Sequence, residues 1–152
     1  YKYVSDSEAQ QIQIVMQKDI NGYKRLFGGR LAEWIDIVAA VVARRHSEKE
    51  VTTVCIDNLH FKAAAYVNNT LLLKGKITYA GNTSMEVKVE TFVEKLNGER
   101  NHINTAYIVL VAIDENGKPS AVPKLILKTD EERKEWENAQ IRQKNRMKYT
   151  DR

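Results

Sequence analysis

The chain has 152 residues, of which 43% are hydrophobic and 29% charged, as in an ordinary globular protein that folds in water. No run approaches the roughly 18 apolar residues that span a bilayer, and the first residues lack the apolar core of a signal peptide, so we expect no membrane contact. The net charge is +4, but no Lys/Arg run is interleaved with aromatic residues, which argues against nucleic acid and suits a phosphorylated small molecule.

The first part of the chain predicts one strand followed by one long helix. The stretch QIQIV (11–15) alternates apolar and polar residues, which is the period of a half-buried strand. From Gly29 to about Arg45, apolar residues recur at helical spacing. Past Asp36 they surround the helix almost completely, which predicts that it is buried on nearly every side. Two glycines, Gly28 and Gly29, stand directly ahead of this run.

The second part predicts four long strands and a charged helix. The strand candidates, separated by turn signals rich in Gly and Asn, are residues 51–61, 70–80, 84–96 and 104–114. Along 84–96, Met85, Val87, Val89, Thr91 and Val93 mark one face, and Glu86, Lys88, Glu90 and Glu94 mark the other. Connections this short favour antiparallel neighbours. The stretch 129–132 has the form of a capping box and opens a charged helix over about 130–148.

A helix that is apolar all round needs a sheet curled around it. The predicted order of elements therefore indicates an α+β chain with the layout of a hot-dog fold, in which an antiparallel sheet wraps a long central helix, followed here by a C-terminal helix. We expect a single domain over residues 1–152, with its core at about 11–125. Because one copy of such a sheet exposes an edge strand and part of the helix, we also expect copies to pair.

Two glycines and an aspartate stand out as candidates for chemistry. A helix begins with free N–H groups and the positive end of its dipole, and Gly28 and Gly29 let a carbonyl oxygen approach those donors closely. The same glycines also suit a simple turn or helix cap. Asp36 lies two helical turns further on the same side, as a general base, a nucleophile or an ordinary surface aspartate. Glu33 is a competing carboxylate that we expect to face solvent.

Other catalytic and metal-binding signatures are absent from the sequence. His46, His60 and His102 have no metal-ligand spacing, and the patterns HExxH, GxSxG, P-loop and GxGxxG do not occur, so we expect no metal and no cofactor. Cys55 lies in a strand pattern and is expected to pack in the core. As the single cysteine it excludes an intrachain disulfide and suits a reducing compartment, which predicts a cytoplasmic protein.

The order Asn21, Phe27-Gly28-Gly29, Asp36 resembles the N-x(6)-GG-x(6)-D signature of the hot-dog acyl-CoA thioesterases. More narrowly, it resembles the group that contains bacterial YciA and the brain-type acyl-CoA hydrolases. The similarity in layout covers roughly residues 11–125 and includes the family's Phe-x-Lys-Pro-like turn at 61–63. It also includes the family's Gly-x-Ser/Thr-Ser turn, here Gly81, Asn82, Thr83 and Ser84.

The resemblance implies hydrolysis of acyl-CoA to a fatty acid and CoA, with CoA as part of the substrate and product and with no cofactor. Asp36 would be the catalytic carboxylate, the N–H of Gly29 would polarise the thioester oxygen, and Asn21 of the other subunit would help position water or substrate. The implied contacts with CoA and substrate are Gly28, Lys62, Gly81, Asn82, Thr83 and Ser84. The active site would form across a dimer interface, and such dimers often assemble into hexamers.

The chain departs from the family at two loop positions that would border the substrate. The family commonly has a glycine where this chain has Lys24, and a proline where it has Ala63. These departures leave room for a non-catalytic acyl-CoA-binding module or sensor, which would bind without turnover. A third alternative, a hot-dog dehydratase, generally needs a histidine near the helix start, and none of the three histidines lies there.

Overall fold

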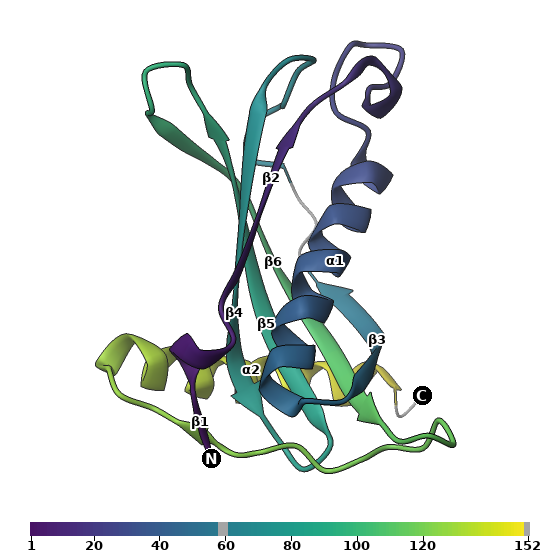
Figure 1. Ribbon diagram of the computed structural model, residues 1–152, viewed down its shortest axis with the longest axis vertical. Helices are drawn as coiled ribbons and strands as arrows, with labels where there is room; N and C mark the ends of the chain where they lie inside the picture. Colours follow the sequence, from purple (N-terminus) through teal and green to yellow (C-terminus); the bar gives the residue numbers. More distant parts are fainter. Residues whose placement is uncertain (58–60, 151–152) are drawn as a thin grey trace.

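The computed structural model describes the chain over residues 1–57 and 61–150, and its side chains up to residue 147. The elements in chain order are β1 (Lys2–Tyr3), η1 (Val4–Asp6), β2 (Ala9–Ile14), η2 (Gln17–Asp19), α1 (Gly28–Ser47), β3 (Glu50–Asp57), β4 (Thr70–Ala80), β5 (Ser84–Glu94), β6 (Arg100–Ile113), β7 (Leu125–Ile126) and α2 (Asp130–Thr150). An antiparallel sheet of order β2-β4-β5-β6-β3 curls around α1, while β1 and β7 form a small parallel pair (Figure 1). This is the predicted hot-dog arrangement.

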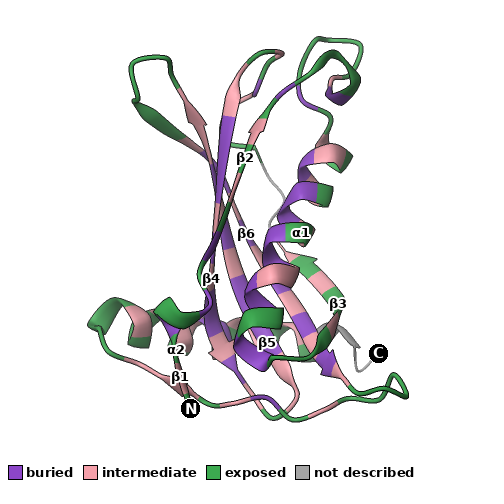
Figure 2. Ribbon diagram, viewed as in Figure 1, coloured by how far each residue is buried: buried purple, intermediate pink, exposed green. Residues whose placement is uncertain are grey.

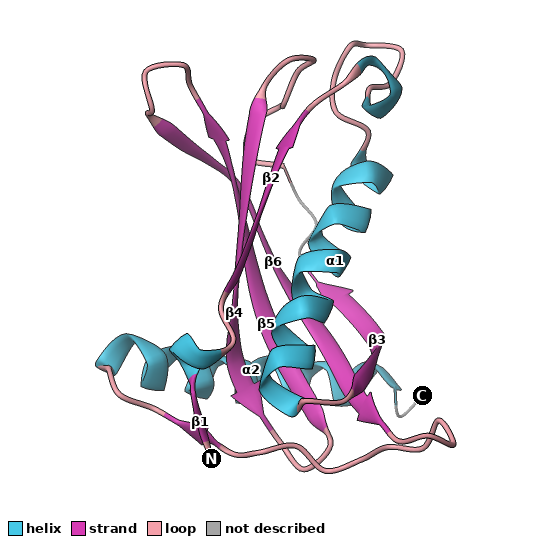
Figure 3. Cartoon of the chain, viewed as in Figure 1, coloured by secondary structure: helices cyan, strands magenta, loops and turns pink. Residues whose placement is uncertain are grey.

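The core lies between α1 and the face of the sheet that curls around it (Figure 3). The helix contributes a stripe of fully or almost fully buried residues, namely Leu31, Trp34, Ile35, Val38, Ala39, Val42 and Ala43. A glycine in β4, Gly75, allows the helix to approach closely, because a Cβ there would lie 2.7 Å from Cγ1 of Val38. The absence of a side chain at Gly75 thus allows the short distance between α1 and the sheet.

One side of α1 is uncovered in the single chain (Figure 2). Ile37 is 47% exposed, and Asp36 beside it is half-buried. This side of the helix lies next to β3, the edge strand, because Asp36 is hydrogen-bonded to Thr53 of that strand. The prediction that α1 is buried on nearly every side is therefore wrong for the single chain, since five strands do not reach around the whole helix.

Strand β2 shows the predicted alternation, but its isoleucines are the exposed residues. Ile12 and Ile14 are 66% and 49% exposed, whereas Gln11 and Gln13 are half-buried. β2 is the other edge strand of the sheet, so few neighbours are available to cover its outward face. A period of two predicts a strand but does not say which of its faces the rest of the chain covers.

The long hairpins lie close to their predicted positions. β4 has the bounds expected for 70–80, while β6 begins at Arg100, ahead of the predicted start at 104. The reason is that the turn at Gly98, with φ 91°, lets pairing continue up to Glu94 and Arg100. β3 ends at Asp57, and residues 58–60, including His60, lie outside the described residues.

Helix α2 packs on the opposite face of the sheet from α1 (Figure 3). Its predicted cap is present in shifted form: the hydroxyl of Thr129 accepts a hydrogen bond from the N–H of Glu132 (3.0 Å), and the Glu132 carboxylate accepts one from the N–H of Lys128 (2.8 Å). Glu86 lies on the predicted polar face of β5 but is only 2% exposed. Two arginines of α2 cover it, so this helix is part of the packed structure.

Candidate active site

Helix α1 begins without a side-chain cap. The carbonyl of Phe27 accepts hydrogen bonds from the N–H groups of Arg30 (3.0 Å) and Leu31 (3.2 Å), and no side chain of the preceding residue caps the first turn. A Cβ added to Gly28 would meet no atom within 4 Å, so open space adjoins the helix start. At Gly29, by contrast, an added Cβ would lie 2.7 Å from a ring carbon of Phe27, so the open space lies on the Gly28 side of the helix start.

The first turn of α1 is held in place by Asp19, which the sequence analysis did not single out. Asp19 is 3% exposed, and its carboxylate pairs with Nε of Arg30 at 3.1 Å. Its backbone carbonyl accepts a hydrogen bond from the N–H of Phe27 at 2.8 Å. A carboxylate near a helix N-terminus is favourable for the helix dipole. Asp19 could not be recognised from the sequence, because an acidic residue this far ahead of the glycines matches no helix-capping pattern.

Asn21 shapes the loop that leads into α1. Its side-chain Oδ1 accepts hydrogen bonds from the N–H groups of Tyr23 (2.9 Å) and Arg25 (3.3 Å), which forms an Asx-type turn. Within this turn Lys24 has a φ of 62°, in the left-handed region that glycine adopts at lower cost. The residue that departs from the family's glycine therefore sits at a backbone conformation that suits glycine better.

A cavity of about 460 Å³ brings three of the predicted residues together. Asn21, Gly28 and Lys62 all line it. The backbone N–H of Lys62 donates to the carbonyl of Ile103 (2.8 Å), which anchors this segment to β6. The Lys62 Nζ lies 3.3 Å from Nδ1 of His102. One cavity thus combines a cationic side chain with an uncapped helix start, and both favour an anionic or carbonyl group.

Asp36 lies outside that cavity, further along α1 and beside β3. Its Oδ1 accepts a hydrogen bond from Oγ1 of Thr53 at 2.6 Å. Thr53 was not singled out from the sequence, because the strand residue that meets Asp36 depends on a register that includes a bulge between Thr53 and Cys55. Glu33 is exposed and pairs with Arg30 at 3.0 Å, as expected of a surface carboxylate.

The turn 81–84 lies at the opposite end of the sheet from the start of α1 (Figure 1). Lys124 holds this turn, because its Nζ contacts the carbonyl of Gly81 (3.4 Å) and Oδ1 of Asn82 (3.2 Å). Within one chain the turn is therefore separate from the cavity and from Asp36. The predicted site residues therefore occupy three separate places in one chain.

Cys55 and His46 have structural surroundings. Cys55 was expected to pack in the core, but it is only half-buried. Its thiol donates a hydrogen bond to Asp57 (3.3 Å). Burial raises the pKa of the Cys55 thiol, and the hydrogen bond to Asp57 adds to this, so the thiol is a poor nucleophile at neutral pH. Nε2 of the buried His46 lies 2.7 Å from the carbonyl of Pro123, and burial lowers the pKa of His46.

The described residues contain neither a metal-binding cluster nor a membrane-spanning helix. Over 1–57 and 61–150, no three or more His, Cys, Asp and Glu side chains are grouped so that they would hold a metal ion. In the same part of the chain, neither helix combines the length and apolar character needed to cross a membrane.

Residues 23–98 match the family described as the Thioesterase superfamily. A protein of Bacillus subtilis strain 168, named as an uncharacterized acyl-CoA thioester hydrolase, YkhA, is 34% identical over 132 residues, which make up 86% of this chain and 77% of that protein. The chain belongs to the thioesterase superfamily, as the Asn, Gly-Gly and Asp signature predicted.

Solved structures of acyl-CoA thioesterases share the fold. A hexameric acyl-CoA thioesterase in its apo form has a TM-score of 0.89 and 36% identity, over 98% of this chain and 97% of that chain. An acyl-CoA hydrolase of Staphylococcus aureus, solved with butyryl coenzyme A, coenzyme A and coenzyme A disulfide, has a TM-score of 0.85 and 27% identity, over 99% and 89%. Variants of the Staphylococcus enzyme with an Asp, a Thr or an Asn replaced by Ala have also been solved.

Proposed function

We propose that this chain hydrolyses acyl-CoA to a fatty acid and CoA, with Asp36 as the general base for water or as the nucleophile. The observation that carries the proposal is the half-buried Asp36 carboxylate, held at 2.6 Å by the hydroxyl of Thr53 beside the uncovered side of α1. A neutral hydroxyl fixes one carboxylate oxygen and leaves the other to accept a proton or attack a carbonyl.

The variants of the Staphylococcus aureus enzyme support this choice of residues. The Asn, Asp and Thr replaced there are separated by the same intervals along the chain as Asn21, Asp36 and Thr53 are here. Equal intervals are expected if the two chains use one arrangement of loop, helix and edge strand. We therefore assign Thr53 as the residue that positions Asp36, and Asn21 as a residue that positions water or substrate.

The start of α1 supplies the other half of the proposed reaction. The N–H of Gly29 polarises the thioester oxygen, while Gly28 and Lys62 border the cavity that accepts part of the CoA moiety. Thiolate is a good leaving group, so an activated water can attack the polarised carbonyl and release the fatty acid and CoA directly. Alternatively, the carboxylate attacks the carbonyl and expels CoA, and water then hydrolyses the resulting mixed anhydride to the fatty acid and the free carboxylate. The positive net charge of +4 favours the approach of the CoA phosphates.

Two copies of the chain complete each proposed site. Asp36 faces the uncovered side of α1 along the free edge of β3, whereas Asn21 lines a cavity elsewhere in the same chain. Pairing of two copies along β3 would cover this edge and bring Asn21 of one copy toward Asp36 of the other. We propose that such dimers assemble further, which brings the turn 81–84 to the CoA of another copy. We also retain the prediction of a cytoplasmic protein, which rests on the single cysteine.

The test is the release of free thiol from a panel of acyl-CoAs, from short to long chains, by the wild type and Asp36→Asn. We expect kcat to fall by about a hundredfold or more, because the amide keeps the size of the side chain and loses its basicity. Glu33→Gln removes the neighbouring exposed carboxylate and should keep the wild-type rate. Retention of activity by Asp36→Asn would refute the assignment, and binding of CoA esters by the wild type without turnover would favour the acyl-CoA sensor.

A further inference from the structure

The contacts of α2 show that this helix crosses the sheet toward its free edge. From its start to its end, the ion pairs of the helix are Glu131 with Lys76 of β4 (3.5 Å), Glu135 with Lys88 of β5 (3.3 Å), Arg142 with Glu86 of β5 (2.7 Å) and Arg146 with Asp57 of β3. The guanidinium of Arg142 also lies over the ring of Tyr107 in β6, 3.6 Å from its centroid. The contacts thus progress across the sheet, and the side chain of Arg146 reaches from Glu86 of β5 to Asp57 of the edge strand β3.

The helix does not end at this edge. It continues from Arg146 to Thr150, which at about 1.5 Å per residue adds about 6 Å. Neighbouring strands of a sheet lie about 4.8 Å apart, so these residues add about the spacing of one strand. Within the part of the chain that the structure describes, β3 is the last strand on this side of the sheet. The terminal turn of α2 therefore lies at the free edge of the sheet.

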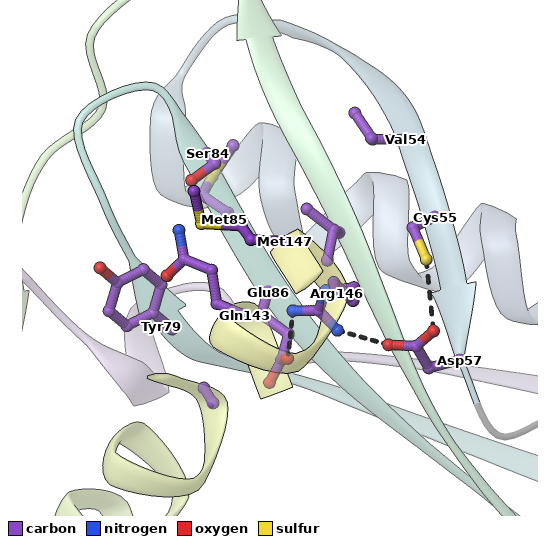
Figure 4. Close-up of a pocket in the computed structure, with 12 residues that line it drawn as sticks. Val54, Cys55, Asp57, Tyr79, Ser84, Met85, Glu86, Gln143, Arg146 and Met147 are labelled. Carbon is purple, nitrogen blue, oxygen red and sulfur yellow. Dashed lines mark hydrogen bonds and ion pairs between the residues drawn. The ribbon is translucent and has the colours of Figure 1, made fainter. Parts of the chain in front are cut away.

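An apolar groove of about 510 Å³ lies between the second half of α2 and the strands beneath it, and it extends to β3 (Figure 4). The residues that give it apolar character include Val54 of β3, Val109 of β6 and Met147 of α2. Val54 is 63% exposed and Met147 is 57% exposed. The charged groups of its wall are matched with one another, because Arg146 pairs with both Asp57 and Glu86. Such a groove favours an apolar protein surface over a charged ligand.

We infer that the end of α2 clasps a second copy of this chain, with Met147 and the last helical turn lying over the partner's edge strand. This inference rests on the pairing along β3 proposed above and adds α2 to that interface. A two-fold pairing of the β3 edges carries the partner's strand to the free edge beside the end of α2, and the partner's α2 returns the same contact. Ile56 of β3 (36%) and Ile37 of the neighbouring helix α1 (47%) are also exposed, so a partner at this edge covers apolar side chains in addition to the groove.

The first test compares Met147→Lys with Ile141→Lys by sedimentation velocity over a range of protein concentrations. Ile141 is a matched control, because it is also 57% exposed and apolar on the same helix, but it does not line the groove. We expect Met147→Lys to raise the concentration at which the assembly dissociates by about tenfold or more, and Ile141→Lys to leave it unchanged. Equal dissociation of the two variants would overturn the clasp.

The second test locates the contact directly. A photoreactive benzoylphenylalanine replaces Met147, unlabelled and ¹⁵N-labelled proteins are mixed and allowed to exchange, and the crosslinked peptides are identified by mass spectrometry. We expect products of mixed label that join position 147 to the peptide of β3. Products of one label alone, in an assembled protein, would contradict the inference while leaving the proposed hydrolysis intact. An assembled protein with mixed-label products but no thiol release would instead refute the proposed function and keep the clasp.

Discussion

The two long helices lie on opposite faces of one sheet and are attached by opposite means. Helix α1 packs an apolar stripe against the sheet, with Ile35 fully buried and Val38 only 2% exposed. Helix α2 is polar and is held by ion pairs with strand residues, among them Glu86 with Arg142 at 2.7 Å. Apolar packing requires that the side chains fit together in shape. Ion pairs also require a group of opposite charge at each position. Each face also carries a carboxylate with different surroundings, Asp36 on the side of α1 and Glu86 under α2.

The two carboxylates differ in their hydrogen-bond partners. Glu86 is 2% exposed and receives hydrogen bonds from Thr78 (2.7 Å), Arg142 (2.7 Å) and Arg146 (3.2 Å). Asp36 is half-buried and is bonded to the hydroxyl of Thr53. A carboxylate that is closed off and matched by two cations has little capacity left for a proton or a carbonyl carbon. The proposal of Asp36 as the catalytic carboxylate therefore rests on its hydrogen-bond partner and not on its burial.

The largest expected effect comes from removing the ion pairs that attach α2 to the sheet. In the double variant Arg142→Met and Arg146→Met, Glu86 stays buried without its cations, and the free energy of unfolding in urea should fall by about 3–5 kcal/mol. Lys76→Met removes the exposed pair with Glu131 at the start of α2 and should cost less than about 1 kcal/mol. Adding Glu86→Leu to the double variant should restore part of the loss. A double variant no less stable than Lys76→Met would show that α2 is attached by other contacts.

An intermediate effect is expected where α1 meets the sheet. Gly75→Ala places a methyl group where Cγ1 of Val38 lies at 2.7 Å, so we expect a loss of about 1–3 kcal/mol by overpacking in chemical denaturation. Val38→Ala in the same chain makes room for that methyl group, and the two losses should be less than additive. Gly22→Ala is the control, because a Cβ there meets no atom within 4 Å. Strict additivity would mean that another neighbour limits the approach of α1.

The elements of the fold were predictable because their signals are local. The run 29–45 corresponds to α1 (Gly28–Ser47), and the strand 70–80 is β4. Periodicity did not predict which apolar side chains are buried within a single chain. Ile12 of β2 and Ile37 of α1 belong to periodic runs, and both are exposed. Both lie beside an edge of the sheet, where burial depends on what binds there. Burial of Glu86 likewise depends on a helix some fifty residues later in the chain.

The candidate site was predictable only in part, for a related reason. The family signature indicated Asn21, Gly28 and Asp36, and the loop contacts of Lys62 place it in one cavity with the first two. Thr53 could not be found in this way, since a bulge in β3 decides which strand residue meets Asp36. The register of a bulged edge strand is a tertiary property, and one inserted residue reverses the faces of the strand.

The smallest expected effect concerns this contact. Thr53→Val keeps the size of the side chain and removes the hydroxyl that holds Asp36, so kcat should fall by about two- to tenfold, the value of one neutral hydrogen bond, with KM nearly unchanged. Thr53→Ser should recover the rate, and Thr52→Val, at the neighbouring exposed position of the strand, should not alter it. Suppose instead that Thr53→Val acts like wild type while Asp36→Asn is inactive. The backbone of α1 would then orient the carboxylate of Asp36 without help from Thr53. The two carboxylates would differ further, because Glu86 is held by side chains of another element and Asp36 would be held by its own helix alone.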